Sequence, residues 1–170
     1  MAPLFENKVV AAMRAHVVTP ETETEALLAG AQFVDAYQLE IEGPALNAPT
    51  AARRILGRAP HWVSLLMALR NRVVAPWGLK TPAPDALESS KQIGIFPLLS
   101  QTPDRVVLGL EDKHLDFRVV VDVSHPGNSS RVTLTTLVRT HNLLGRTYLA
   151  IILPFHRIIA LAMLQQVSAP

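Results

Sequence analysis

The chain of 170 residues has no cysteine, which excludes disulfide bonds and thiolate metal sites. This absence suits a reducing compartment, so a cytoplasmic protein is expected. Its six histidines are scattered without the close spacing of metal ligands, so neither a metal nor another cofactor is predicted. Charged residues are also scarce, at 18% against a usual value of about 25%. The apolar fraction of 49% is ordinary, and the length suits one domain over residues 1–170.

Several motifs that mark known enzyme classes are missing. There is no Gly-x-Ser-x-Gly of a hydrolase nucleophile, and no Gly-x-Gly-x-x-Gly or Gly-x-x-x-x-Gly-Lys of a nucleotide-binding loop. No secretory signal is expected either, because Glu6, Lys8 and Arg14 interrupt the apolar residues near the N-terminus. Residues 1–18 fit two interpretations, a helical stripe or a segment that ends in an edge strand at Val17-Val18.

The net charge of +2 is small but unevenly distributed. Residues 1–49 carry seven acids and two bases, whereas residues 50–80 carry six bases and no acid. The basic segment could attract an acidic ligand, but neutralisation of the acidic segment nearby is the favoured interpretation. No known nucleic-acid-binding motif accompanies these arginines, so nucleic-acid binding is not predicted.

The first half of the chain predicts one strand among helices. Thr19-Pro20-Glu21 is typical of a helix start and Gly30 of a helix end, which predicts a helix over 20–29. Strict alternation predicts a strand over 33–42. Two helices are predicted next, over 50–56 and 60–75, and a proline-rich connector follows them.

The second half predicts an antiparallel meander. Short turns separate four runs that have strand character, at 92–100, 105–111, 114–124 and 131–141. Gly94 and Pro97 weaken the first run and indicate an edge strand or a bulge. An antiparallel sheet of this kind has an apolar face that another element must cover.

The last segment predicts that cover. Asn142 is a good N-cap for a long helix over 143–167, and sheet and helix together give the α+β class. Leu149–Leu164 is the sole candidate for a membrane span. It is short for one, and it carries Pro154, His156 and Arg157 near its middle. A buried helix is therefore expected in place of a transmembrane one.

A family resemblance rests on particular stretches of this sequence. The order of elements resembles the helix-grip fold of START-like and birch-pollen-allergen-like (SRPBCC) domains. Over roughly residues 30–165 the chain resembles, more specifically, the domain-of-unknown-function family numbered 2867. The stretches that carry this resemblance are Ala31-Gln32-Phe33-Val34-Asp35, Pro60-His61-Trp62, Leu69-Arg70-Asn71, Trp77-Gly78-Leu79, Leu115-Asp116-Phe117-Arg118-Val119, His141-Asn142, Gly145-Arg146-Thr147-Tyr148 and Pro154-Phe155-His156. The resemblance implies the fold but no settled activity. Members of the wider fold carry lipids, hormones or polyketides, and some are cyclases or dehydratases.

The leading hypothesis is a site for a hydrophobic or amphipathic small molecule between the sheet and the last helix. His156 falls among apolar residues of that helix and would face the sheet as a polar anchor, although a hydrogen-bonded core histidine is favoured. The predicted lining, with Phe33 as a further wall residue, consists of Tyr37, Trp62, Leu66, Phe117, Arg118, Tyr148, Ile152, Phe155, His156 and Met163.

Two alternatives stay open. An enzyme of the cyclase, dehydratase or isomerase type would use His156 with Asp116 or Arg118. His114, Asp116 and Arg118 share one face of a strand, but an apolar row opposite favours a solvent-exposed face for them. The other alternative is an oligomerising interaction module, since the last helix has little polar surface. Its outer face could pack on Val9–Val18 or on a second copy of the chain.

Overall fold

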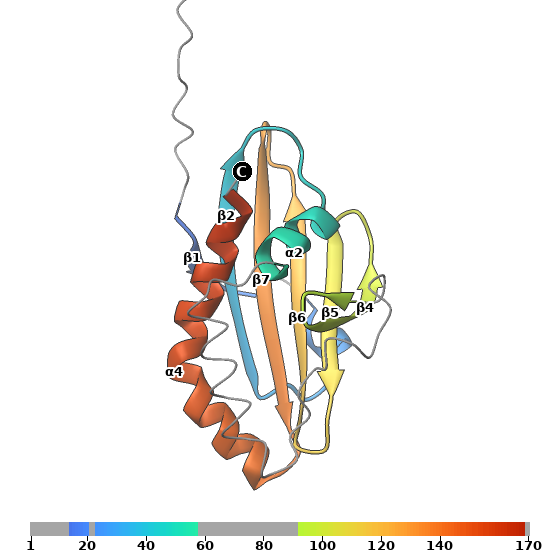
Figure 1. The fold of residues 1–170 in the computed structure, drawn as a ribbon, viewed down its shortest axis with the longest axis vertical. Coiled ribbons are helices and arrows are strands. Elements are labelled where there is room, and N and C mark those ends of the chain that lie inside the picture. Colours follow the sequence, from blue (N-terminus) through green and yellow to red (C-terminus); the bar gives the residue numbers. More distant parts are fainter. Residues whose placement is uncertain (1–13, 21–22, 58–91, 169–170) are drawn as a thin grey trace, which may run out of the picture.

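The computed structural model describes residues 14–20, 23–57 and 92–168. In these ranges seven strands form one antiparallel sheet, in the order β1-β2-β7-β6-β5-β4-β3, and a long helix lies along one face (Figure 1). The strands are β1 His16–Val18, β2 Phe33–Glu42, β3 Gln92–Ile93, β4 Phe96–Gln101, β5 Arg105–Glu111, β6 Leu115–Ser124 and β7 Ser129–Thr140. The helices are α1 Thr24–Leu27, α2 Ala48–Leu56 and α4 Leu143–Gln165, which a 3-10 turn, Gln166–Ser168, extends. The predicted α+β helix-grip arrangement is confirmed.

Alternation along the long strands gives the sheet two different faces. The inner face, which α2 and α4 cover, receives the odd-numbered residues of β2 and β6 and the even-numbered residues of β5 and β7. The core on this face is almost entirely aliphatic. Its buried strand residues are Tyr37, Leu39, Val106, Leu108, Val119, Val121, Val123, Val132 and Leu134.

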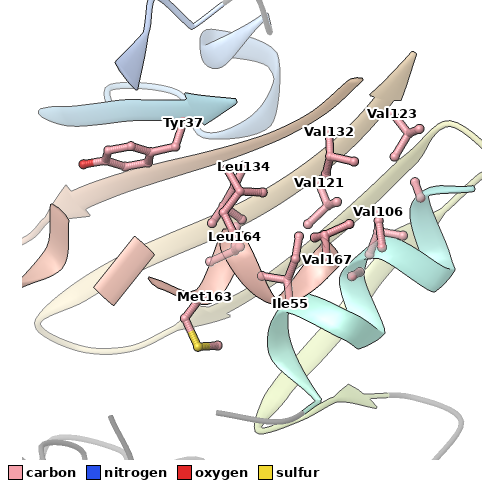
Figure 2. Packing of buried hydrophobic residues seen from close by; sticks show 14 of the residues in the cluster. Tyr37, Ile55, Val106, Val121, Val123, Val132, Leu134, Met163, Leu164 and Val167 are labelled. Atoms are coloured by element: carbon pink, nitrogen blue, oxygen red, sulfur yellow. The ribbon is translucent and has the colours of Figure 1, made fainter. Parts of the chain in front are cut away.

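Helix α2 packs very closely on one half of this face. Asn47 caps it by accepting a hydrogen bond from the Thr50 N–H at 2.9 Å. The side of α2 that meets the sheet has Ala48, Ala51 and Ala52, all fully buried, and these small side chains let the backbone approach the strands. Ile55 from α2 and the last turns of α4 complete the packing (Figure 2).

Helix α4 is held by hydrogen bonds at its start and by buried side chains near its end. The Asn142 side chain accepts from the Gly145 N–H at 3.0 Å, and its amide donates to the Lys113 carbonyl at 3.2 Å, which fixes the helix start on the β5–β6 turn. The buried residues of α4 are Gly145, Ala160, Met163 and Leu164. Residues 146–159 thus include none that is fully buried.

The extent of this exposure differs from the sequence-based expectation of a buried helix. Leu143–Ser168 is long and apolar enough to span a membrane by composition, and just 17% of its most apolar stretch is buried. A core helix of a globular domain would have most of such a stretch inside.

The outer face carries a smaller apolar patch. Leu28, which follows α1, packs on Val107, Val120 and Leu137 from the three central strands. Charged and hydroxyl side chains occupy the rows on either side of this patch. This is the pattern expected of an antiparallel sheet that packs its main apolar core on one face alone.

Three predicted elements differ in extent. The helix expected over 20–29 is the four-residue α1, with no side-chain cap hydrogen bond from Glu23 at its start. The strand expected over 92–100 is divided, because Gly94 has φ +61° and makes a turn between β3 and β4 that packs on the end of α2. The predicted helix over 60–75 lies outside the described residues.

Of the two interpretations of residues 1–18, the edge strand is correct for the last three residues. His16–Val18 pairs antiparallel with Ala36–Gln38 of β2 and forms one edge of the sheet. The alternative helical stripe does not extend into this segment.

Candidate functional site

A polar cluster joins the middle of α4 to the inner face of β2. The Tyr37 hydroxyl donates to Asp35 Oδ2 at 2.7 Å, because residues two apart on a strand share a face. His156 Nε2 of α4 lies 3.3 Å from both carboxylate oxygens of Asp35. The Phe33 and His156 rings form a T-shaped pair, with centroids 5.7 Å apart and planes at 84°. Phe33 and Asp35 of one strand therefore contact the imidazole, and Tyr37 of the same strand holds Asp35.

The burial of this cluster sets its chemistry. The side chains of Asp35 and His156 are 16% and 22% exposed, and Tyr37 is almost fully buried. A carboxylate removed from water needs hydrogen-bond donors, and Tyr37 and His156 supply them. An ionised carboxylate only accepts, so a neutral imidazole that bonds to it would carry its proton on Nε2. Nδ1 is then left as an acceptor, oriented by Asp35 in the way that a second group orients a catalytic or ligating histidine.

The same surroundings raise the pKa of Tyr37. Burial is the largest cause, the hydrogen bond to Asp35 and the charge of Asp35 add to it, and the positive charge of Arg157 opposes it. A raised pKa means that the phenol stabilises the fold at all pH values below its ordinary pKa of about 10. That contribution is lost as the pH rises from there toward the pKa of the folded state.

A spectroscopic titration of the two tyrosines, Tyr37 and Tyr148, tests this arrangement. In a Tyr148→Phe variant the remaining phenol is expected to ionise only where the protein unfolds in alkali. Adding Asp35→Asn should move its ionisation to lower pH, since the substitution removes the negative charge and keeps an acceptor. Ionisation of Tyr37 at its ordinary pKa in the folded single variant would contradict the described hydrogen bond.

The structure brings some of the predicted lining residues to the inner side. Tyr37 and Phe117 belong to the inner face, and Phe117 packs edge-to-face on Phe96 with ring centroids 5.7 Å apart. Met163 is buried in the packed core at the end of α4. Tyr148 and Ile152 are half-buried on the first part of α4. Trp62 and Leu66 lie outside the described residues.

Phe155 differs from its predicted place in the lining. The Phe155 side chain lies on the outer side of α4 and is 50% exposed. Apolar character all round α4 hid this difference in the sequence, because a helix without a polar face gives no sign of which side meets the sheet.

Arg118 and Asp116 lie on the other side of the sheet from His156. Arg118 crosses Gly109 and donates to Glu111 at 2.6 Å, and it shares the outer face with Val107 and Val120 of the apolar patch. The hypothesis of an enzyme that pairs His156 with either residue is therefore wrong. The sequence analysis favoured a solvent-exposed face for Asp116 and Arg118. Both residues do belong to the outer face of the sheet, but they are themselves buried in ion pairs.

Asp35 is the site residue that the sequence analysis missed. Two signals pointed to it, since it shares the strand face of Tyr37 and it ends the family-like stretch Ala31-Gln32-Phe33-Val34-Asp35. Alternation alone placed a carboxylate on an otherwise apolar face, and a buried carboxylate requires a partner. That partner comes from a helix more than a hundred residues later, which periodicity does not reveal.

A separate polar pocket of about 520 Å³ opens on the outer face. It spans the ends of several strands and is lined by Gln38, Ser100, Thr102, Asp104, Arg105, Asp122, Val123, Ser124, Arg131 and Thr133. Arg105 Nε donates to Asp122 at 2.6 Å, so opposite charges within it neutralise each other. Its polar lining does not suit the apolar ligand that the sequence predicts. Within the three described ranges, no group of three or more His, Asp or Glu residues could hold a metal ion.

Comparison with known proteins places the chain in a family. Residues 27–163 match the family described as "Protein of unknown function (DUF2867)". The chain belongs to the DUF2867 family. The match covers both β2 with Asp35 and the part of α4 with His156, so the DUF2867 segment contains the whole cluster. No curated protein matches this DUF2867 chain in sequence.

Six solved chains match this DUF2867 structure. CalU16 from Micromonospora echinospora has 12% identity and a TM-score of 0.33, over 80% of this chain and 78% of CalU16. Human STARD10 has 8% identity and a TM-score of 0.28, over 81% of this chain and 66% of STARD10. Neither similarity is high enough to carry an argument about function.

Proposed function

We propose that this protein is a cytoplasmic binding protein for a hydrophobic or amphipathic small molecule, held between the inner face of the sheet and α4. The observation that carries the proposal is the Asp35–Tyr37–His156 cluster, a set of polar groups on a face whose core is mostly aliphatic. Small-molecule sites combine apolar walls with a few placed polar groups in this way. His156 of the cluster also belongs to residues 146–159 of α4, the part without fully buried residues.

The orientation of His156 narrows the chemistry of the ligand. Its Nε2 lies 3.3 Å from Asp35 Oδ1, and in the neutral tautomer that donates to this carboxylate Nδ1 would accept a hydrogen bond from the ligand. A hydroxyl or amide N–H would satisfy it. A carboxylate would be repelled by Asp35 unless His156 were protonated. The favoured ligand therefore has an apolar body and one neutral hydrogen-bond donor.

Native mass spectrometry of freshly purified protein, with organic extraction, is the first test. We expect a bound apolar compound or, after its removal, uptake of a long-chain fatty alcohol used as probe. His156→Phe should weaken binding of the alcohol about fivefold, the usual effect of one net hydrogen bond. Arg53→Gln, on the exposed side of α2, serves as the matched control and should bind like the wild type.

The outcomes of this test separate two claims. A protein that carries no compound and takes up no alcohol would contradict the binding function. Unchanged binding by His156→Phe would leave the binding function standing and show that His156 is not the polar contact.

The pairing of Asp35 with His156 favours a second candidate function. A histidine whose Nε2–H is held by a carboxylate is a suitable general base, so an isomerase, dehydratase or cyclase reaction remains a proposal with Asp35 in place of Asp116 or Arg118. Incubating the extracted compound with the protein tests it. If the wild type converts the compound and both His156→Phe and Asp35→Asn abolish this conversion, the protein is an enzyme. If the compound is recovered unchanged, the protein is a carrier.

A further inference from the structure

The start of α4 is held by an asparagine that uses both ends of its side-chain amide. Asn142 Oδ1 accepts from the Gly145 N–H at 3.0 Å, which caps the helix. Asn142 Nδ2 lies 3.2 Å from the Lys113 carbonyl oxygen and 2.9 Å from His114 Nδ1. An N–H needs an acceptor and a carbonyl needs a donor, so the contacts with Gly145 and Lys113 fix which end of the amide is oxygen. A reversed amide would lose both hydrogen bonds.

This orientation determines which form of His114 fits. The Asn142 Nδ2 carries two hydrogens, so it can donate one to the Lys113 carbonyl and the other to His114 Nδ1. For the second contact to be a hydrogen bond, Nδ1 must accept and therefore carry no proton. A protonated imidazole has an N–H at both ring nitrogens, so it would direct a donor at a donor and end this bond. The Asn142 amide could not turn over to restore it without giving up its two other bonds.

The first turn of α4 rests on the same residue. A Cβ at Gly145 would overlap the carbonyl oxygen of His114, so helix and turn are in close backbone contact here. Farther along, residues 146–159 include none that is fully buried, and Pro154 lacks the N–H that would bond to the preceding turn of the helix. The bonds of Asn142 therefore attach a part of α4 that has little burial of its own.

We propose that the contact of His114 with Asn142 is a pH-sensitive latch: neutral His114 holds the start of α4 on the β5–β6 turn, and protonation of His114 in acid releases it. Histidine is the side chain whose charge ordinarily changes between about pH 8 and pH 5. The release is local, because the next attachment along the helix responds in the opposite sense. His156 lies beside the Asp35 carboxylate, so its protonation would strengthen that contact.

The charges around the latch act on a proton at His114 in both directions. Carboxylates favour the charged imidazole, and cations oppose it. Asp116 is already paired with Arg139 and His141, and in the described part of the chain no carboxylate forms a hydrogen bond with the His114 ring that could replace the one to Asn142. The charged and titratable groups on the elements around His114 are Glu111, Asp112, Lys113, Asp116, Arg118, Arg139, His141 and Arg146.

Amide hydrogen exchange of the full chain, followed by NMR and corrected for the pH dependence of intrinsic exchange, tests the latch. Between about pH 7.5 and pH 5, the protection of the Gly145 amide should fall about fivefold in the wild type, the usual effect of one net hydrogen bond. The amide of the buried Leu164 should keep its protection. In His114→Asn, an oxygen bonded to Cγ replaces Nδ1 and is not protonated in this range, so Gly145 should be equally protected at both pH values.

Asn142→Asp should reverse the response of the Gly145 amide. A carboxylate still caps the helix, but it accepts from a protonated Nδ1, so protection should be higher at the lower pH. The matched control is His16→Asn, at an exposed histidine of β1, which should respond to pH like the wild type.

Three results would overturn the latch. The first is a Gly145 amide whose protection does not change with pH in the wild type. The second is an equal fall in the wild type and in His114→Asn. The third is a parallel fall at Leu164, which would show that acid unfolds the domain as a whole and does not release the start of α4.

Discussion

Gly145→Ala is expected to destabilise the protein by about 3 kcal/mol, the upper end of the usual cost of overpacking. In an exposed helix the same substitution would instead stabilise by up to about 1 kcal/mol, because alanine favours helical backbone. The difference in sign comes from one contact. A Cβ at this position would overlap the carbonyl oxygen of His114 and lie 3.0 Å from its carbonyl carbon. Both atoms belong to the backbone of the β5–β6 turn, which cannot move aside as a side chain can.

Urea unfolding measures this effect, with Thr147→Ala on the exposed side of the same helix as control. The control is expected to stay within about 0.5 kcal/mol of the wild type. The turn that Gly145 contacts is fixed by three bonds. The His141 N–H donates to the His114 carbonyl at 2.9 Å, and the Asn142 amide group meets the Lys113 carbonyl and the His114 ring. A Gly145→Ala variant as stable as the wild type would mean that α4 does not rest on this turn.

Asp116→Asn is expected to cost about 2 kcal/mol at neutral pH and to reduce the sensitivity of the fold to acid. The Asp116 carboxylate, with its side chain 6% exposed, accepts from Arg139 at 2.7 Å and from His141 Nε2 at 3.0 Å. Breaking a fully buried ion pair costs about 3–5 kcal/mol, but Arg139 and His141 are 39% and 33% exposed, so water compensates them in part. An asparagine amide would also direct one N–H toward these donors.

The pH dependence follows from the pKa of Asp116. Burial, the largest influence, would raise this pKa, but hydrogen bonds from His141, Arg139 and the Asp112 backbone, with the charge of His141, together lower it below 3.8. A lowered pKa contributes stability above the ordinary value, and that stability disappears as the pH falls through the folded-state pKa. Urea unfolding from neutral pH to below pH 3.8 should therefore show a smaller loss for the variant than for the wild type.

Glu111→Gln is the control for this experiment. Its side chain is 73% exposed although it pairs with the buried Arg118, so the change should alter stability by no more than about 1 kcal/mol. An Asp116→Asn variant with wild-type stability and wild-type acid sensitivity would show that the carboxylate is not part of a folding network. Asp116 therefore has a structural role in place of the catalytic one that the sequence suggested, because its partners are Arg139 on β7 and His141 just after β7.

The elements with strong periodicity were predictable from the sequence. Alternation gave β2 its bounds, Phe33–Glu42, and Asn142 marked the start of α4, because alternation and capping are local properties of neighbouring residues. The turn at Gly94 was harder to predict from the sequence, because its positive φ is required by the packing of that turn on the end of α2 and not by the strand itself. The side on which α4 exposes its apolar residues depends on how the helix packs on the whole sheet, so the sequence of the helix alone does not predict it.

The candidate site was predictable in part for a related reason. Tyr37 and His156 were expected to face the gap between sheet and helix, and they meet through Asp35. Arg118 was assigned to the lining as a possible anchor, although its parity on β6 is opposite to that of Phe117. Strand parity is a strict constraint, and applying it to every lining residue would have removed Arg118 and drawn attention to Asp35.

The pairing of β2 with β7 has a consequence for the order in which the chain acquires its structure. Phe33 faces Val138, 105 positions later, whereas β5, β6 and β7 are joined by short turns. Closing so long a loop is slow compared with forming hairpins, so β2 is expected to wait for the meander. During synthesis from the N-terminus, Asp35 emerges long before the strand that will support it and the helix that brings His156. Until β7 leaves the ribosome, β2 can pair only with the three-residue β1, and its apolar face depends on being shielded from other chains.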